Sequence, residues 1–232
     1  MLPGEGKGQA QGGAGDKSAD RGVGIKICGL CTDADVAAAN HLLPDYVGFV
    51  FAPGSKRFVN FDQAEALAGA LDERITPVGV FVDASVTEVA SAVRRGIVRV
   101  VQLHGREDEA FAASLRDEVA VPIIKAFSMD DDEALAQAEQ SSADFVLLDA
   151  GKGGTGRTFD WSRARRLARP FILAGGLNAG NVGVALRELR PFAVDMSTGV
   201  ETDGAKDPAK MRAAIEVVRS YEAREVGKET DR

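Results

Sequence analysis

The sequence predicts an α/β protein that folds as a single (β/α)8 barrel, also called a TIM barrel. Short β-branched runs alternate along the chain with longer segments that are rich in Ala, Leu and Arg and have helical periodicity. Eight such strand–helix units can be counted, most of them a little over about twenty residues long. The length of 232 residues is close to the roughly 250 typical of such barrels. A steady series of right-handed crossovers brings the eighth strand beside the first, which favours closure over the alternative, an open doubly wound sheet.

The expected strands are the short apolar runs, and Asp149 falls where the sixth of them meets solvent. They span Val23–Cys28, Tyr46–Phe51, Pro77–Val82, Val98–His104, Val121–Ala126, Phe145–Asp149, Phe171–Ala174 and Ala193–Ser197. Several of the helices that follow them open on Asp or Asn, whose side chains cap the free N–H groups of a first turn. They span Asp33–Leu43, Phe61–Leu71, Val86–Arg95, Asp108–Val119, Asp131–Glu139, Asp160–Ala168, Asn178–Leu189 and Asp207–Ala223.

The two ends of the chain differ in composition from the barrel, which we assign to residues 22–221. Residues 1–21 consist mainly of Gly, Ala, Gln and charged residues, with too little apolar surface to offset the entropy lost on ordering. We expect a disordered N-terminal tail there. Residues 222–232 are also highly charged, and we expect them to form a tail that frays beyond the last helix.

The composition excludes several classes of partner. The net charge of −7 argues against a nucleic acid or an anionic membrane. No stretch approaches the roughly 20 apolar residues of a membrane span, and the N-terminus lacks the apolar centre of a secretory signal. The two cysteines, Cys28 and Cys31, cannot form the disulfide framework of a secreted protein, so they indicate a reducing compartment or a chemical role. We therefore expect a cytoplasmic protein.

In a (β/α)8 barrel, functional residues lie on the loops that follow the strands. Polar residues and glycines gather in these positions along the chain: Cys28–Gly29, Ser55–Arg57, Asp83, His104–Gly105, Ser128, Asp149–Gly156, Gly175–Asn178 and Ser197–Glu201. Because the carboxyl ends of all eight strands meet at one end of a barrel, these residues are expected to share one site.

A phosphate site is expected in three of these loops. After Asp149, four glycines surround Thr155, so that bare N–H groups and a hydroxyl can converge on an anion; a mobile surface loop is the alternative. The loop lacks the Gly-Lys-Ser or Gly-Lys-Thr of a Walker motif and the dinucleotide-binding fingerprint. Gly175–Gly176 and Ser197–Gly199 strengthen the interpretation, because the loops after strands seven and eight are the recurrent phosphate site of such barrels.

Eight motifs follow one another along the chain: Lys26–Leu30, Gly48–Phe51, Ser55–Arg57, Val101–Gly105, Gly153–Gly156, Phe159–Trp161, Leu173–Asn178 and Val194–Glu201. In this order and spacing they closely resemble the phosphoribosylanthranilate isomerases of tryptophan biosynthesis, part of aromatic amino-acid biosynthesis. The resemblance covers about residues 23–219. It implies an isomerase, an intramolecular oxidoreductase of the aldose–ketose type. The implied reaction is the Amadori rearrangement of N-(5-phosphoribosyl)anthranilate to 1-(2-carboxyphenylamino)-1-deoxyribulose 5-phosphate, with no metal and no organic cofactor.

The resemblance also implies the roles of two residues. Ring opening needs an acid that protonates the ribose ring oxygen, and the resulting Schiff base must lose its C2′ proton to a base on the other side of the sugar. The family's acid corresponds to Asp149 and its base to Cys28. Since a free thiol titrates at about 8.5 and a free Asp at about 3.9, both need help from their surroundings. Strand alternation points Lys26 toward the same side as Cys28, where it can assist a thiolate, unless Asp195 on the neighbouring eighth strand pairs with it.

The remaining site residues are expected to bind the substrate, a small phosphosugar. The guanidinium of Arg57 matches the anthranilate carboxylate in two places, and His104 is expected to line the anthranilate side. The phosphate is expected to bind N–H groups and hydroxyls of the glycine-rich loops. These residues are Gly154, Gly156, Gly175, Gly176, Ser197, Thr198 and Gly199. No metal is expected, and the chain is expected to be a monomer or a homodimer.

Three alternatives remain open. Cys28 and Cys31 have the spacing of a redox pair, or with His104 could be imagined as a zinc site, although metals need more ligands. The family usually has Thr at the position of Cys31 and Asn at that of Asp83, which leaves an oxidisable pair and the role of Asp83 open.

A histidine-pathway isomerase performs the same rearrangement with two Asp residues, and Cys28 argues against it. The last alternative is a catalytically silent phosphate-binding barrel.

Overall fold

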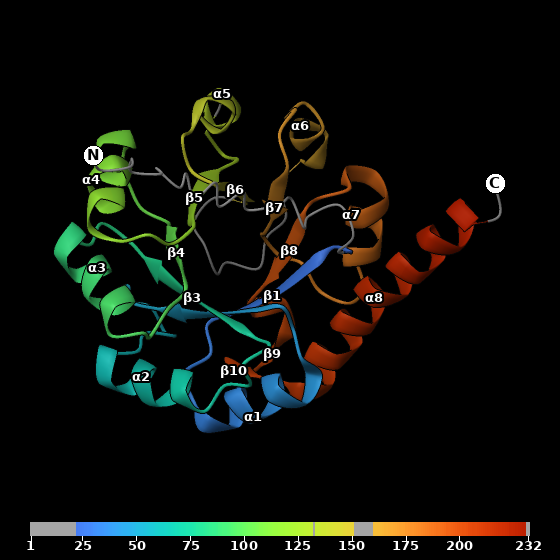
Figure 1. The fold of residues 1–232 in the computed structure, drawn as a ribbon. Coiled ribbons are helices and arrows are strands. Elements are labelled where there is room, and N and C mark those ends of the chain that lie inside the picture. Colours follow the sequence, from blue (N-terminus) through green and yellow to red (C-terminus); the bar gives the residue numbers. More distant parts are fainter. Residues whose placement is uncertain (1–21, 132, 151–159, 231–232) are drawn as a thin grey trace, which may run out of the picture.

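Eight parallel strands form a closed barrel in a computed structural model that describes residues 22–131, 133–150 and 160–230. The strands pair in sequence order, and the eighth returns to the first with Lys26 in register with Asp195. Figure 1 shows the helices around the outside of these strands. The (β/α)8 barrel is thereby confirmed, and the open doubly wound sheet is excluded. The tail expected at residues 1–21 lies outside the described residues.

The strands lie close to the predicted positions. They are β1 Gly24–Cys28, β2 Tyr46–Val50, β3 Thr76–Phe81, β4 Val100–Leu103, β5 Ile123–Ser128, β6 Phe145–Asp149, β7 Phe171–Leu173 and β8 Ala193–Met196. The helices are α1 Asp33–Leu42, α2 Phe61–Gly69, α3 Val86–Arg94, α4 Glu109–Glu118, α5 Ala134–Gln140, α6 Trp161–Ala164, α7 Val182–Leu189 and α8 Pro208–Thr230. Between β8 and α8 lie a short 3-10 helix, η2 Thr198–Val200, and a two-stranded hairpin, β9 Glu201–Thr202 and β10 Ala205–Lys206.

The helix ends differ most from the prediction. Helix α7 begins at Val182 because the expected first residues instead form side-chain-capped turns. The Asn181 side chain accepts from the Asn178 N–H at 2.8 Å, and the Asn178 side chain accepts from the Gly180 N–H at 2.8 Å. Helix α6 ends at Ala164 instead of Ala168, whereas α8 continues to Thr230, past the expected end at Ala223.

The strands separate two apolar clusters. The larger cluster lies between strands and helices and includes Ile27, Phe49 and Val194. The smaller cluster consists of residues on the opposite strand face: Val78, Val100, Ile124, Leu147, Ile172, Ala174 and Ala193. Two residues farther along β4, β6 and β8, the same inward face carries Gln102, Asp149 and Asp195, which are buried polar residues. The barrel interior is therefore apolar toward the amino ends of these strands and polar at their carboxyl ends.

A capping box fixes the start of α1, shortly after the end of β1. The Thr32 hydroxyl accepts from the Asp35 N–H at 3.2 Å, and the Asp35 carboxylate accepts from the N–H groups of Thr32 and Cys31 at 3.0 and 2.9 Å. This fixes the backbone just past Cys28. No helix in the described part of the chain is both long and apolar enough to cross a membrane.

Candidate active site

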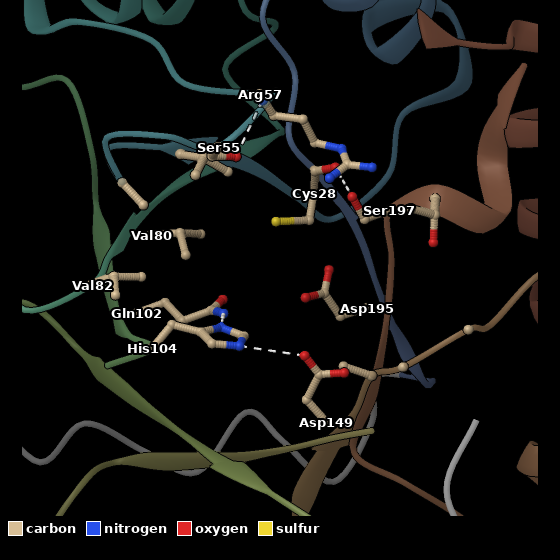
Figure 2. Close-up of a pocket in the computed structure, with 16 residues that line it drawn as sticks. Cys28, Ser55, Arg57, Val80, Val82, Gln102, His104, Asp149, Asp195 and Ser197 are labelled. Atoms are coloured by element: carbon tan, nitrogen blue, oxygen red, sulfur yellow. Dashed lines mark hydrogen bonds and ion pairs between the residues drawn. The ribbon is translucent and has the colours of Figure 1, made fainter. Parts of the chain in front are cut away.

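A cavity of about 310 Å³ lies at the carboxyl ends of the strands. The structure brings eight of the predicted residues into its lining: Cys28, Arg57, His104, Asp149, Gly175, Gly176, Ser197 and Thr198. Gly199 is not part of the lining, and Gly154 and Gly156 lie outside the described residues. Figure 2 shows Cys28 and Asp149 facing the cavity from opposite sides.

The predicted base, Cys28, ends β1 and is nearly inaccessible to solvent. Its sulfur fits because β2 carries Gly48 beside it: a Cβ at Gly48 would lie 2.7 Å from Sγ. Burial raises the pKa of the Cys28 thiol, and the nearby Lys26 ammonium opposes this rise without cancelling it. Lys26 is thus the positive neighbour that the sequence predicts, but in the unliganded protein the neutral thiol is favoured over the thiolate.

The expected pair between Lys26 and Asp195 is confirmed. Lys26 Nζ lies 2.8 Å from Asp195 Oδ2, and the two side chains are only 2% and 8% exposed. Burial alone would lower the pKa of Lys26, but the negative charges of the Asp195 carboxylate and of Cys28 in its thiolate form raise it overall. Asp195 also acts against thiolate formation, because its negative charge raises the pKa of Cys28. Among the described residues, Asp195 Oδ1 has no hydrogen-bond partner.

The predicted acid, Asp149, ends β6 and is part of a chain of polar contacts. Its Oδ1 accepts from the Ala150 N–H at 2.7 Å, and its Oδ2 lies 3.3 Å from Nε2 of His104. On the other side of the imidazole, Nδ1 lies 2.8 Å from Nε2 of Gln102. When the Gln102 amide donates to Nδ1, the ring proton is on Nε2 and points toward Asp149. Figure 2 shows these contacts along one wall of the cavity.

Asp149 also packs against a glycine of the neighbouring loop. A Cβ at Gly175 would lie 2.7 Å from the Ala150 nitrogen and 3.0 Å from Asp149 Oδ1, and Gly175 has a φ of +87°. Both the space and the backbone conformation therefore require glycine.

Arg57 and several apolar side chains of β2, β3 and the loops after them line the cavity. Arg57 follows β2 and forms two hydrogen bonds of 2.7 Å to Glu201, from Nε to Oε1 and from Nη2 to Oε2. Lys206 Nζ lies 2.5 Å from the same Oε1. The apolar residues that line the cavity near the ends of these strands are Val50, Ala52, Val80 and Val82. A cationic group beside an apolar wall suits a ligand that combines an aromatic ring with a carboxylate.

Glycines and hydroxyls lie on the β7–β8 side. Gly175 and Gly176 follow β7, and Ser197 and Thr198 follow β8. The Ser197 hydroxyl donates to the backbone carbonyl of Cys28 at 3.0 Å, which ties this loop to β1. The loops after β7 and β8 meet at Gly199, where a Cβ would lie 1.9 Å from the carbonyl oxygen of Leu177.

Comparisons with known proteins agree with this site. A family model described as N-(5'phosphoribosyl)anthranilate (PRA) isomerase matches residues 25–217. The chain belongs to this family. The N-(5'-phosphoribosyl)anthranilate isomerase of Endomicrobium trichonymphae is 40% identical over 200 residues, which cover 84% of this chain and 98% of the relative.

Solved structures of phosphoribosylanthranilate isomerases have the same fold. The enzyme of Thermus thermophilus superimposes with a TM-score of 0.78 at 34% identity, covering 85% of this chain and 99% of that one. Another structure, with a TM-score of 0.74 at 32% identity and the same coverage, holds reduced 1-(o-carboxyphenylamino)-1-deoxyribulose 5-phosphate.

Several residues of this phosphoribosylanthranilate isomerase family site were not predicted from the sequence. The apolar wall and Gln102 could have been found from strand alternation, because Gln102 and His104 continue the inward series of β4. The contact between His104 and Asp149 was also missed, since only an anthranilate-side position was expected for the imidazole. Glu201 belongs to a motif that resembles the family, but nothing in the sequence indicates that it pairs with Arg57.

The two cysteines of this family member lie in different surroundings. Both are free thiols; Cys28 faces the cavity, whereas Cys31 packs against the cluster between strands and helices. Burial and the nearby Asp35 carboxylate raise the pKa of Cys31. Within the described ranges, no three His, Cys, Asp or Glu side chains are grouped so as to hold a metal ion, so Cys28, Cys31 and His104 do not form such a group.

Proposed function

We propose that the protein catalyses the Amadori rearrangement of N-(5-phosphoribosyl)anthranilate to 1-(2-carboxyphenylamino)-1-deoxyribulose 5-phosphate in tryptophan biosynthesis. The observation that carries this proposal is the placement of Cys28 and Asp149 on opposite sides of one cavity in a member of the phosphoribosylanthranilate isomerase family. A thiol and a carboxyl group suffice for the two proton transfers of this reaction.

In the proposed mechanism, Asp149 protonates the ribose ring oxygen, and the ring opens to a protonated Schiff base. The Cys28 thiol gives up its proton to solvent in the cavity, and the thiolate then removes the C2′ proton. The resulting enol takes up a proton at C1′ while its hydroxyl loses one, which gives the ketone. His104 is proposed to hold Asp149 toward the ring oxygen through the 3.3 Å contact. The raised pKa of Cys28 fits this order of events, because the positive charge of the Schiff base favours a thiolate only after the ring has opened.

Two groups of residues support the proposed binding of the substrate. Arg57 and Lys206 carry two positive charges against the single negative charge of Glu201, so this cluster suits one carboxylate. The phosphate is proposed to bind Gly175, Gly176, Ser197, Thr198 and Gly199 on the loops after β7 and β8; Gly154 and Gly156, which are also proposed ligands, lie outside the described residues.

A fluorescence assay with freshly made phosphoribosylanthranilate tests the activity. Turnover by the wild type that collapses in Cys28→Ser and Asp149→Asn supports the assignment, with Cys31→Ser as the matched control that keeps its activity. A wild type that binds inorganic phosphate but does not turn over the substrate would instead favour a catalytically silent barrel.

We further propose that the protein acts in the cytoplasm as a monomer or a homodimer. One solved relative, the enzyme of Thermotoga maritima, is described as dimeric. Light scattering on the purified protein distinguishes the two states.

A further inference from the structure

Arg57, Glu201 and Lys206 form a buried cluster that joins loops far apart in the sequence. Their side chains are 16%, 7% and 2% exposed. Glu201 accepts from both of the others, with two contacts of 2.7 Å to the guanidinium and one of 2.5 Å to the ammonium. The hydrogen bonds from Arg57 and Lys206 lower the pKa of Glu201 even though burial alone would raise it, so Glu201 is ionised.

The path of the Arg57 side chain is fixed by the loop after β1. Gly29 has a φ of +86°, and a Cβ there would lie only 2.2 Å from Cδ of Arg57. The side chain therefore crosses directly over Gly29 before it reaches Glu201. Glu201 occupies the edge of the guanidinium formed by Nε and Nη2. The edge formed by Nη1 and Nη2 is the one that remains for a two-point contact with a ligand carboxylate.

Charge alone gives no reason for Glu201 at this position. A carboxylate beside Arg57 repels a second carboxylate and reduces the net charge of the cluster from two to one. The geometry supplies another reason: two parallel hydrogen bonds hold a long side chain in a single orientation, so that less entropy is lost when the ligand binds.

We propose that Glu201 is a positioning residue that orients Arg57 toward the anthranilate carboxylate. Lys206 is its supporting cation, because it balances the second charge and also donates to the carbonyl of Ser197 at 3.3 Å. The inference rests on the proposed function, in which Arg57 binds that carboxylate.

A comparison of two substrates tests the role of Glu201. N-(5-phosphoribosyl)anthranilate carries the carboxylate, and N-(5-phosphoribosyl)aniline lacks it; product formation from both is followed by chromatography. In Glu201→Gln, kcat/KM for the anthranilate compound is expected to fall about 10- to 100-fold, the usual effect of losing hydrogen bonds to a charged group. The value for the aniline compound is expected to stay within about twofold. Glu216→Gln on the exposed side of α8 is the control for the same change in charge.

A second variant separates charge from geometry. Glu201→Asp keeps the negative charge but is one methylene shorter, so it cannot meet the guanidinium at the same two points. As in Glu201→Gln, kcat/KM is expected to fall for the anthranilate compound and not for the aniline compound. A merely structural role would instead lower kcat/KM for both substrates together with the unfolding temperature, which would overturn the proposal.

Two further outcomes would also count against it. A gain with the anthranilate compound in Glu201→Gln would show that Glu201 is only a repelling charge. If the wild type itself does not distinguish the two substrates, the carboxylate-binding role of Arg57 fails, and the inference about Glu201 fails with it. The proposed isomerase activity would still stand after this last result, and it fails only if the wild type does not turn over the anthranilate compound.

Discussion

The proposed base side of the cavity, around Cys28, and the proposed acid side, around Asp149, are built differently. Cys28 is buried beside the Lys26–Asp195 pair, and burial raises the pKa of its thiol. Asp149 instead contacts His104, whose side chain is 22% exposed and lines the open cavity. Cys28 and Asp149 are themselves about equally buried, at 9% and 7% exposed, so the two sides differ in the groups around each residue and not in its exposure.

Both sides leave room for the reacting group with a glycine, but for different reasons. Gly48 sits in β2 and is needed only for space, since a side chain there would touch the sulfur of Cys28. Gly175 is needed for space and also for its left-handed backbone. A side chain is therefore expected to be tolerated less well at Gly175 than at Gly48.

The largest expected effect is the loss of kcat when Asp149 or Cys28 is replaced, and the two variants should stop at different steps of the reaction. Asp149→Asn and Cys28→Ser should each lower kcat by about 10²- to 10⁴-fold, the usual contribution of a general acid or base. Borohydride reduces an open-chain Schiff base. The substrate bound to Cys28→Ser should therefore be reduced, because this variant still opens the ring. The substrate bound to Asp149→Asn should not be reduced, because the ring stays closed. Equal trapping by both variants would contradict the assigned order.

The next effect probes the acid side alone. His104→Asn removes the contact to Asp149, and kcat is expected to fall about 10- to 100-fold because a hydrogen bond to a charged group is lost. The pH midpoint of Cys28 alkylation should not move, since His104 belongs to the other side. A change in KM with an unchanged kcat would instead indicate that His104 only binds the substrate.

The two glycines give a smaller, paired test by chemical denaturation. Gly175→Ala adds backbone strain of about 1–3 kcal/mol to steric crowding, so it should lower the free energy of unfolding more than Gly48→Ala. Gly48→Ala crowds Sγ of Cys28 and should lower kcat with little effect on the binding of inorganic phosphate. The reverse order of stabilities would contradict the backbone strain expected in Gly175→Ala.

The smallest effect concerns the pKa of the base, measured as the rate of alkylation against pH in a Cys31→Ser background. The midpoint for Cys28 should lie above the ordinary thiol pKa of about 8.5, because burial favours the neutral form. Lys26→Met should raise it further and Asp195→Asn should lower it. Because the pKa of Cys28 is higher in the folded than in the unfolded protein, its neutral thiol contributes to the free energy of unfolding. This contribution is complete below the ordinary thiol pKa and is lost as the pH rises through the folded-state pKa. A midpoint well below about 8.5 in the unliganded protein would argue for a preformed thiolate.

The parts of the molecule that follow from the periodicity of strands and helices could be predicted from the sequence. Closure of the barrel places β8 beside β1, so the pairing of Lys26 with Asp195 could be predicted from two inward positions. The start of α7 could not, because the side-chain-capped turn between Asn178 and Asn181 competes with a first helical turn.

Contacts between loops could not be predicted from the sequence. Arg57 and Glu201 are 144 residues apart, and their meeting depends on how the chain crosses Gly29. The protonation state of Cys28 was also beyond it, because burial outweighs the charge of Lys26 by an amount that depends on packing.

The most direct test of the account is a crystal structure of this protein with reduced 1-(o-carboxyphenylamino)-1-deoxyribulose 5-phosphate. The account predicts Sγ of Cys28 and a carboxylate oxygen of Asp149 on opposite sides of the same sugar chain, with the ligand carboxylate on Arg57. A ligand with both groups on one side of the sugar, or with its phosphate on Arg57, would contradict the account.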